Sequence, residues 1–500
     1  MVEPLTTLTA GMTLIVGGDR RVQVDEALAN AFGAGDALIV VPDTGELLHI
    51  KKSDRAAAAD AVGAAAGAFR ALGEIDDHAL DTFFAAFADR LGDDTVFAQI
   101  VAANDTDVEQ AKARGRSTTR LVITEAMRRD MIAGLDNWVV TPSLRGHVRR
   151  TITHDGFTLD EVIDRLGVIA FVFEGRPNVF ADALGVLRSG NTVVFRIGSD
   201  ALNTARAIVT HVLEPAREQA GLPKGVVSLV DAASHAAGWA LFSDPRLALA
   251  VARGSGKAVK DLSAVALQAG VPVSAHGTGG AWLIATGTAD VGRLQAVIVH
   301  SLDRKVCNTL NVVVVPRSHA DTLMPVVIDA LTDAASRRDS VPKLHVVGDA
   351  ANYVPVDWFD VPVAVARADG THQETRAEQS DMAVLATEWE WEDAPEMSVV
   401  LCDDLVEAIG LFNTYAPRFV LSVISRDEDD HVLAFNTAEA PYVGDGFTRW
   451  VDGQYALGVP ELGLSNWERG RLLARGGILT GESIATMRYR VRQHDPQVSR

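Results

Sequence analysis

Short apolar runs alternate with helical stretches through much of the chain. From residue 166 onward the runs are GVIAFVF, TVVFRI, GVVSLV, LALAVA, VPVSA, AWLIAT and NVVVV, and several are rich in β-branched residues. Between many of them, apolar residues recur at helical spacing. Strands that alternate with helices in this way form parallel sheets covered by helices on both faces. The pattern therefore predicts an α/β protein with a doubly wound parallel sheet.

The residues ahead of this region follow other patterns. Residues 1–51 contain two strand-like runs, MTLIVGG and DALIVVPDTGELLHI, which end in glycine-rich or Asp-Thr-Gly turns. Alanine-rich helical spacing begins at residue 56, and helices are expected up to about residue 138. We therefore expect a strand-rich appendage of unknown role, residues 1–55, followed by a mainly helical region.

A β-hairpin is predicted at about residues 145–165. The segment HVRRTITHDGFTLDEV alternates apolar and polar residues around Asp155-Gly156, a dipeptide that suits a type I′ turn because both central positions need positive φ. An exposed hairpin has edge strands that can pair with another chain. Two interpretations stay open: an arm that pairs with a second subunit, or a plain surface hairpin.

The chain is too long for a single hydrophobic core. It has 500 residues, of which 48% are hydrophobic and 22% charged. One core usually stops growing at about 250 to 300 residues. Two large lobes are therefore expected.

The net charge and the cysteine content indicate which classes of binding partner and which cellular compartment to expect. The formal net charge is -20 and the basic runs are short, which argues against nucleic acid or a membrane surface as a partner. The two cysteines cannot form a disulfide framework and suit a reducing compartment. No apolar run approaches the roughly 18 residues of a membrane span, and the first residues lack a signal-peptide pattern. A soluble, cytoplasmic protein is expected.

Cys307 is the main candidate for chemistry. It lies in RKVCNTLNVVVVP, after Arg304 and Lys305 and just before a strand-like run. Cations beside a thiol favour the thiolate, which is the form that attacks acyl carbons. A buried structural thiol is the alternative from the residues alone, because free cysteine is often buried. Cys402 precedes two carboxylates in SVVLCDD, so a structural role is expected for it.

The other chemical signals are weaker. The turn RGSGK, with Gly254 and Gly256, lies between a strand-like run and a helical stretch, where backbone amides can bind a phosphate. A plain strand-to-helix turn is the alternative, because the spacing matches neither common nucleotide-binding fingerprint. The sequence contains no HExxH and no G-x-S-x-G motif, so we expect neither a metal site nor a serine hydrolase.

A series of segments spread over roughly residues 56–490 matches one known family in order. The segments are NDTDVEQAKARG, RLGVIAFVFEGRPNVFADALGVLRSGNTVVFRIGSDA, VCNTL, LATEWEW, VEAIGLFNTYA, FTRWVDG, LGVPELGLS and LARGG. Together they resemble the glutamate-5-semialdehyde dehydrogenases, also called γ-glutamyl phosphate reductases, a branch of the aldehyde dehydrogenase superfamily.

The resemblance implies an aldehyde dehydrogenase-like α/β fold. A doubly wound nucleotide-binding lobe is expected at residues 56–298, with the hairpin as a protruding oligomerisation arm, and an α/β catalytic lobe at residues 299–435. The C-terminal segment, residues 436–500, is expected to return to the nucleotide-binding lobe and the oligomer interface. A homodimer or homotetramer follows from the same resemblance.

The resemblance also implies roles for single residues. Cys307 takes the position of the nucleophile, and Asn178 falls where the superfamily has the asparagine of the oxyanion hole. Arg196 falls where a basic residue contacts the cofactor's adenosine ribose or its 2′-phosphate. The further candidates are Ser199, Asp200, Gly254, Gly256 and Glu392 for the cofactor and Arg176, Asn308 and Arg449 for the substrate.

The reaction implied is the reduction of an acyl phosphate, γ-glutamyl phosphate or a relative, through a thioester on Cys307. NADP(H) is the expected cofactor and NAD is possible. Where hydrolytic relatives carry a glutamate base, this chain has HGTGGAW without a carboxylate, which favours acyl transfer over hydrolysis. Lys305 and Asn311 depart from the family's pattern. Two alternatives therefore stay open: a reductase of CoA or carrier-protein thioesters, and a catalytically silent paralogue that acts as a binding subunit.

Overall fold

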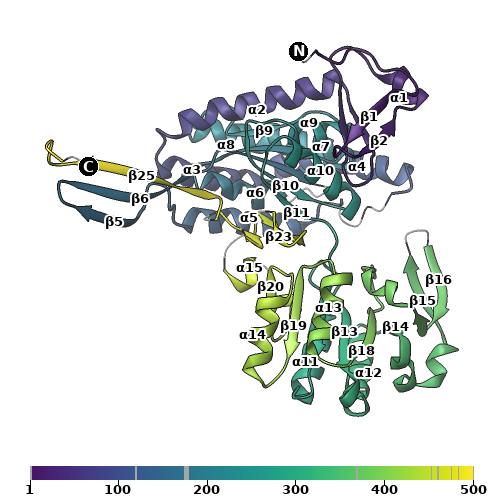
Figure 1. The fold of residues 1–500 in the computed structure, drawn as a ribbon. Coiled ribbons are helices and arrows are strands. Elements are labelled where there is room, and N and C mark those ends of the chain that lie inside the picture. Colours follow the sequence, from purple (N-terminus) through teal and green to yellow (C-terminus); the bar gives the residue numbers. More distant parts are fainter. Residues whose placement is uncertain are drawn as a thin grey trace. The chain divides into compact units, whose positions relative to one another are not determined.

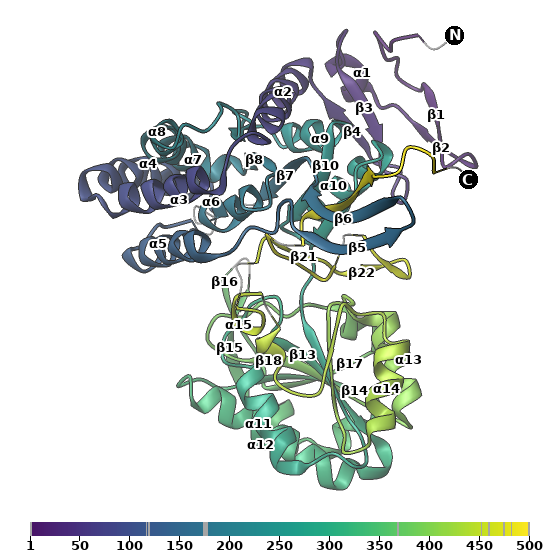
Figure 2. The same ribbon diagram turned by 90° about the vertical axis from the view of Figure 1, so that its left-hand side faces the viewer.

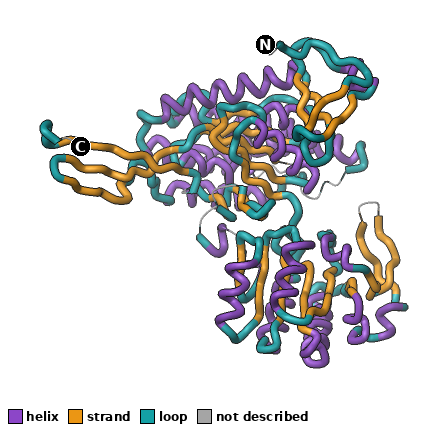
Figure 3. Tube along the Cα trace, in the orientation of Figure 1, coloured by secondary structure: helices purple, strands orange, loops and turns teal. Residues whose placement is uncertain are grey.

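The chain folds into two compact units (Figure 1). The computed structural model describes residues 3–498 except 117, 119–120, 174–178, 368–369, 452, 459–460, 474–475 and 482. Unit 1 consists of Met1–Gly277, Pro460–Leu464 and Ile478–Arg500, and unit 2 of Thr278–Val459 and Ser465–Gly477. In both units strands lie at the centre with helices around them, as the orange and purple segments of Figure 3 show.

A five-stranded parallel sheet forms the centre of unit 1. Its strands are, in spatial order, β11 (Val273–His276), β10 (Leu247–Arg253), β7 (Val168–Phe173), β8 (Thr192–Ile197) and β9 (Val227–Leu229). All residues of β7 and β8 are buried, as expected of strands covered on both faces. The strand order runs outward from β7 in both directions, so the predicted doubly wound sheet is confirmed and its switch point lies between β7 and β10.

Helices cover this sheet. α2 (Lys52–Leu72) packs on β8 and on α9 (Ala236–Phe242), which packs in turn on α10 (Gly256–Gln268). The buried face of α2 is mostly alanine, at spacings of three or four residues, which lets the helix lie close to the sheet. Beyond the first 50 residues, the other α-helices described in unit 1 are α3 (Asp77–Gly92), α4 (Asp94–Ala113), α5 (Glu125–Val140), α6 (Val179–Ala183), α7 (Leu202–Ile208) and α8 (Glu214–Gln219). Among the helices described in either unit, none has the length and apolar character needed to cross a membrane.

A seven-stranded parallel sheet forms the centre of unit 2. Its strands are, in spatial order, β17 (Ala377–Ser380), β14 (Lys343–Val347), β18 (Glu396–Cys402), β13 (Leu310–Pro316), β12 (Ala281–Ala285), β19 (Val420–Ile424) and β20 (Tyr442–Gly444). Two helices cover each face: α11 (Val291–Ser301) and α12 (Ala320–Ser336) on one, α13 (Leu405–Tyr415) and α14 (Glu428–Thr437) on the other.

The position of strand β13 explains why four successive residues, Val312–Val315, are apolar. Val313 and Val315 belong to the core formed with α11 and α12, whereas Val312 and Val314 belong to the core formed with α13 and α14. Successive side chains of a strand point to opposite faces, so the part of a strand that is buried on both faces needs apolar residues at successive positions.

The structure also contains several short elements. They are β15 (Pro362–Arg367) with β16 (Gly370–Thr375), β21 (Gly463–Leu464) with β24 (Ile478–Leu479), β22 (Trp467–Glu468) with β23 (Arg471–Leu472), and α15 (Gly453–Ala456).

The boundary between the units differs from the predicted lobes. The sequence places the end of the first lobe at residue 298, but the structure divides after residue 277, because β12 pairs with β13 and β19 of the second sheet. Likewise, the segment 436–500 does not return to unit 1 as a whole, because β20 pairs with β19. The run AWLIAT reads as a buried strand in either sheet, so local sequence does not show which sheet it joins.

The predicted hairpin is present and gains a third strand. β5 (Val148–His154) and β6 (Phe157–Arg165) are joined at Asp155-Gly156, where Gly156 has a φ of 78°. β25 (Ala485–Gln493) pairs with β6 along its whole length. Figure 1 shows this three-stranded arm projecting from the rest of unit 1. The sequence does not predict β25, because its pairing partner lies far away in the chain.

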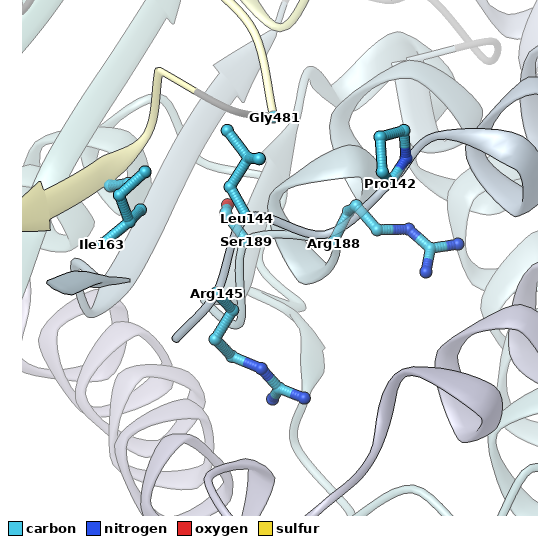
Figure 4. Close-up of a pocket in the computed structure, with 8 residues that line it drawn as sticks. Pro142, Leu144, Arg145, Ile163, Arg188, Ser189 and Gly481 are labelled. Atoms are coloured by element: carbon cyan, nitrogen blue, oxygen red, sulfur yellow. The ribbon is translucent and has the colours of Figure 1, made fainter. Parts of the chain in front are cut away.

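Two arginines, Arg145 and Arg188, hold the base of the arm, where the chain enters β5, against the helices of unit 1. Arg145 donates hydrogen bonds to the carbonyls of Leu72 at 3.1 Å and Ile75 at 2.6 Å. Arg188 donates to the carbonyl of Trp138 and pairs with Asp81 at 2.7 Å. Figure 4 shows both arginines beside a small cavity, which Pro142, Leu144, Ile163, Ser189 and Gly481 also line. Charged hydrogen bonds to α2, α3 and α5 therefore hold the base of the arm, in addition to apolar packing.

Residues 3–50 form a small N-terminal module within unit 1. It contains β1 (Thr13–Val16), β2 (Arg20–Gln23), α1 (Glu26–Ala31), β3 (Ala37–Val40) and β4 (Leu47–Ile50), and its core is formed by Leu8, Val24 and Phe32. β4 packs on α9, and Glu46 pairs with Lys257 of α10 at 2.6 Å. Figure 2 shows β3 and β4 beside these helices. The predicted strand-rich appendage is thus present and is docked on unit 1.

Asp36 links the helix α1, the strand β4 and the start of α2. Its carboxylate accepts hydrogen bonds from the backbone N–H of Gly33 at 2.9 Å, the backbone N–H of Lys52 at 2.7 Å and Nε2 of His49 at 2.7 Å. Burial opposes ionisation, but these hydrogen bonds outweigh it and lower the pKa of Asp36 from 3.8 to about 2.

We expect the N-terminal module to loosen as the pH falls from 3.8 towards about 2. A carboxyl group whose pKa is lower in the folded state stabilises that state above its unfolded pKa, and the effect is lost as the pH falls through the folded value. Pepsin cleavage within residues 3–50, compared with cleavage elsewhere by mass spectrometry, measures the loosening. Asp36→Asn should be cleaved early even in mildly acidic buffer, whereas Asp19→Asn, at an exposed position, should behave like the wild type. Equal cleavage of the wild type and Asp36→Asn at every pH would contradict this role.

Candidate active site

The loop ahead of β13 carries Cys307. The N–H of Val306 donates to Oγ1 of Thr309 at 2.8 Å, and this hydroxyl donates to the carbonyl of Arg304 at 2.6 Å. The side chain of Thr309 therefore closes the loop on itself. Cys307 lies in the bend and is partly exposed, while these hydrogen bonds hold the backbone of the loop.

Two glycines lie against the backbone of Cys307. The N–H of Gly280 donates to the carbonyl of Cys307 at 2.8 Å, and Gly280 has a φ of 106°, which residues with a Cβ rarely adopt. At Gly279 an added Cβ would lie 2.7 Å from Cα of Cys307 and 2.7 Å from its carbonyl oxygen. The segment HGTGGAW therefore needs glycine at these positions because two backbone segments touch there.

Glu388 links the glycine segment to the cysteine loop. One carboxylate oxygen accepts from the N–H of Gly279 at 2.6 Å, and the other pairs with Nζ of Lys305 at 2.6 Å. The side chain of Lys305 is only 6% exposed. The cation that the sequence places beside the thiol is therefore committed to an ion pair with Glu388.

The strand β13 fixes the segment that carries Glu388. The side-chain amide of Asn311 donates to the carbonyl of Thr387 at 2.8 Å, and its oxygen accepts from the N–H of Trp389 at 2.9 Å. The ring of Trp389 stacks on His345, with centroids 3.6 Å apart. Asn311, which departs from the family's pattern, thus positions the backbone on both sides of Glu388.

The two predicted substrate residues that are described, Asn308 and Arg449, hold the other side of the cysteine loop. The side-chain amide of Asn308 donates to the carbonyl of Val451 at 2.9 Å, and its oxygen accepts from a guanidinium N–H of Arg449. Arg449 also pairs with Asp303 at 2.7 Å. The structure brings both residues to the loop, but their polar groups contact protein.

A cavity of about 240 Å³, partly open to solvent, lies beside the segment that Asn308 contacts. The rings of Phe447 and Trp450 pack against each other at its wall, with centroids 4.6 Å apart and an interplanar angle of 56°. Arg293 also lines it and pairs with Asp445 at 2.6 Å. The cavity combines apolar surface with a balanced ion pair, which suits a small polar molecule with an aliphatic chain.

In unit 1, the predicted cofactor residues lie at the carboxyl ends of the parallel strands. Gly254 and Gly256 follow β10, and α10 begins at Gly256. A Cβ on Gly277 would lie 3.0 Å from Cα of Gly256, so only a bare backbone fits there. Ligands of doubly wound sheets bind at this edge, next to the switch point, and helix N-termini there favour phosphate. These residues fit a dinucleotide.

The remaining cofactor candidates surround the end of β8. Arg196 is buried in β8 and donates to the carbonyl of Ser234 at 2.8 Å. Ser199 and Asp200 follow in a short helical turn, and Asp200 pairs with Arg114 at 3.1 Å and Arg116 at 2.5 Å. The sequence prediction missed these two arginines, although Arg114 lies within the family-like segment NDTDVEQAKARG.

Other predicted residues are not brought to these sites. Asn178 and Arg176 lie outside the described residues. Glu392 is exposed, and its backbone carbonyl accepts a hydrogen bond from Arg338 at 2.6 Å. Glu388, in the LATEWEW segment just before it, contacts the cysteine loop instead. The sequence does not single it out, because Glu388, Glu390 and Glu392 occur at every second position and nothing in their spacing shows which one faces the loop.

The second cysteine is unsuited to nucleophilic chemistry. Cys402 is 1% exposed at the end of β18. Burial, with smaller effects of Glu407, Asp404 and Asp403, raises its pKa to about 12. The thiol is therefore protonated at neutral pH. Within the described part of the chain, no group of three His, Cys, Asp or Glu side chains is arranged to hold a metal ion.

We expect Glu388→Gln to lower the free energy of unfolding by roughly 1 to 3 kcal/mol, because it leaves the buried ammonium group of Lys305 without its charged partner. Urea denaturation measures the change. The double variant Lys305→Met/Glu388→Gln should recover part of the loss, because the unpaired charge is gone. Glu390→Gln is the matched control: Glu390 is 65% exposed and lies 3.7 Å from Lys305. Equal losses in Glu388→Gln and Glu390→Gln would refute a special role for this pair.

The doubly wound sheet of unit 1, the antiparallel arm and the second parallel sheet with its cysteine loop are those of an oxidoreductase of the aldehyde dehydrogenase class, which uses a nicotinamide cofactor. The sequence profile of the aldehyde dehydrogenase family matches residues 178–346. A solved γ-glutamyl phosphate reductase from Thermotoga maritima has the same fold, with a TM-score of 0.76 at 21% identity over 89% of this chain and all of that one.

Curated relatives narrow the class further. The γ-glutamyl phosphate reductase of Afipia carboxidovorans is 30% identical over 79% of this chain and 86% of its own length. That of Syntrophomonas wolfei is 32% identical over 76% of this chain and 84% of its own length. The chain therefore belongs to the γ-glutamyl phosphate reductase family, as the ordered segments of its sequence predict.

Proposed function

We propose that this chain reduces γ-glutamyl phosphate, or a close relative of it, to the aldehyde, with NADPH as the reductant and a thioester on Cys307 as the intermediate. The observation that carries the proposal is the setting of Cys307: a partly exposed cysteine in a loop that contacts with Thr309, Gly280 and Glu388 hold in place. The curated relatives support the choice of an acyl phosphate.

At Cys307 the proposed reaction has two stages, transfer of the acyl group to sulfur and reduction of the resulting thioester. The thiolate attacks the carbonyl carbon, a C–S bond forms, and the C–O bond to phosphate breaks, so that inorganic phosphate leaves with the electron pair. A reduced nicotinamide cofactor, which residues such as Gly254 and Gly256 would help to hold, would supply the hydride that reduces the thioester carbon. The C–S bond then breaks, which returns the thiolate and releases the aldehyde. One proton is consumed overall, on the phosphate released.

In this reaction the protein holds the thiol in position and disfavours hydrolysis of the thioester by water. The hydrogen bond from Gly280 to the carbonyl of Cys307 fixes the position from which the sulfur attacks. Glu388 is a carboxylate that contacts this loop, and its oxygens already accept from Gly279 and Lys305. A carboxylate engaged in this way is a poor general base for water, which supports transfer of the acyl group to hydride rather than hydrolysis. Asn178 as an oxyanion donor stays a prediction.

The reverse reaction tests the proposal. Purified protein is incubated with glutamate semialdehyde, NADP⁺ and phosphate, and NADPH formation is followed by absorbance. We expect turnover that depends on phosphate. Turnover only when CoA replaces phosphate would instead identify a thioester reductase, and no turnover with either acceptor would favour a binding subunit without catalysis.

We also propose that the arm pairs with a second copy of the chain in a dimer or tetramer. β25 presents Tyr489 and Val491, which are 60% and 61% exposed, and β5 has an unpaired edge in the described arm. Exposed apolar residues and strand edges are the usual basis of pairing between subunits. Light scattering of the purified protein gives the assembly size, and a monomer would contradict the proposal.

A further inference from the structure

The second strand of the doubly wound sheet ends beside an unusual charge arrangement. In dinucleotide-binding sheets, the carboxylate after the second strand accepts a hydrogen bond from the ribose 2′-hydroxyl of NAD, whereas an arginine near this place accommodates the 2′-phosphate of NADP. In unit 1 the first strand is β7 and the second is β8, and Asp200 follows β8. Asp200 is therefore where the choice between NAD and NADP is expected to be made.

Both oxygens of this carboxylate are already engaged. Oδ1 of Asp200 pairs with Nη1 of Arg114 at 3.1 Å, and Oδ2 pairs with Nη1 of Arg116 at 2.5 Å. A carboxylate held in this way is a poor acceptor for a ribose hydroxyl. Two guanidinium groups against one carboxylate also leave a net positive charge, which favours an anionic group over a neutral hydroxyl.

The two arginines are held in place and accessible. They follow the C-terminal end of α4, which packs on the turn that carries Asp200. The side chains of Arg114 and Arg116 are 49% and 48% exposed. A guanidinium has five N–H donors, and the hydrogen bonds to Asp200 use one from each. Asp200 thus fixes the spacing of two forks before any ligand arrives, which reduces the ordering cost of binding.

We propose that Arg114 and Arg116 form a clamp for the 2′-phosphate of NADP(H), held open by Asp200, and that this clamp makes the enzyme prefer NADP over NAD. The proposal rests on the proposed function only in placing a dinucleotide at the carboxyl ends of this sheet. Arginine suits the task because its planar fork donates two parallel hydrogen bonds to a phosphate.

Binding of nucleotide fragments tests the clamp without any catalysis. Calorimetry gives dissociation constants for 2′,5′-ADP, which carries the 2′-phosphate, and for 5′-AMP, which lacks it. We expect the wild type to bind 2′,5′-ADP at least about tenfold more tightly than 5′-AMP. In Arg114→Gln/Arg116→Gln this preference should fall by about tenfold or more, while the 5′-AMP constant stays unchanged. No preference in the wild type, or the same preference in the glutamine variant, overturns the proposal.

Two further variants separate the clamp from a structural role. Arg114→Lys/Arg116→Lys keeps both charges but loses the planar forks, so its preference should lie between those of the wild type and the glutamine variant. Arg337→Gln, which removes an exposed arginine paired with Asp333 in unit 2, should bind both fragments like the wild type. Unchanged 5′-AMP binding shows that a variant is folded. If the lysine variant loses the preference as fully as the glutamine variant, a clamp based on charge is refuted.

The result of the nucleotide-binding test does not depend on which acyl substrate the enzyme reduces. A chain that fails to reduce an acyl phosphate but binds 2′,5′-ADP through the two arginines refutes the proposed function and keeps the clamp. A chain that reduces the acyl phosphate equally well with NADH and NADPH, and binds both fragments alike, refutes the clamp and keeps the function.

Discussion

Replacing Cys307 with alanine is expected to lower kcat of the phosphate-dependent reaction by about 10⁴-fold or more, because no other group forms the thioester. The fold should persist, since backbone groups and the side chain of Thr309 hold the loop. NADPH formation measures the rate, and mass spectrometry of the wild type with substrate, but without reductant, should show the acyl group on Cys307.

Cys402→Ala is the matched control. This thiol is buried in β18, and burial keeps its pKa far above neutrality. We expect the variant to retain most of the wild-type kcat and to lose only a little stability. If Cys307→Ala kept a substantial part of the activity, or Cys402→Ala lost as much, the assignment of the nucleophile would fail.

Gly279→Ala is expected to have the second largest effect. The added Cβ would lie 2.7 Å from Cα of Cys307, from its carbonyl oxygen and from Oε1 of Glu388. The first two contacts are backbone atoms, which have little room to give way. Overpacking of this kind costs about 1 to 3 kcal/mol of stability, and a nucleophile displaced by roughly 1 Å loses about 100-fold in rate.

Gly410→Ala provides the comparison for Gly279→Ala. Gly410 lies in α13 of the same unit, and nothing is within 4 Å of an added Cβ. Alanine in a helix is more favourable than glycine by about 0.5 to 1 kcal/mol, so this variant should be at least as stable as the wild type and fully active. Denaturation and kcat are measured for both. Wild-type values for Gly279→Ala would show that the two backbone segments are not tightly constrained.

Features with a local signal could be predicted from the sequence. The run Val312–Val315 is apolar at every position because β13 is covered on both faces, and Asp155-Gly156 marks a hairpin because glycine tolerates the positive φ observed there. Cys307 was ambiguous from its neighbours, and only the ordered family-like segments favoured it as the nucleophile. The fold class and the family are confirmed.

Features that depend on distant partners could not be predicted. The strand β25 reads ATMRYRVRQ, whose many charges suit a surface position, and nothing in it identifies β6 as its partner. The run AWLIAT fits either parallel sheet equally well. Glu388 and Glu392 are indistinguishable without knowing that Asn311 holds the backbone on both sides of Glu388. In each case pairing in space decides, and sequence spacing does not encode it.

During synthesis, β6 is made long before its partner strand β25. Arg165 and Ala485 are opposite each other in the arm, so the ribosome must add about 320 residues between them, which takes roughly 15 to 60 seconds at typical elongation rates. During that interval the edge of β6 that β25 will cover stays bare on the nascent chain. Such an edge can pair with the same edge of a neighbouring nascent chain. Slow translation of unit 2 would therefore lengthen the period in which the arm is open to wrong partners.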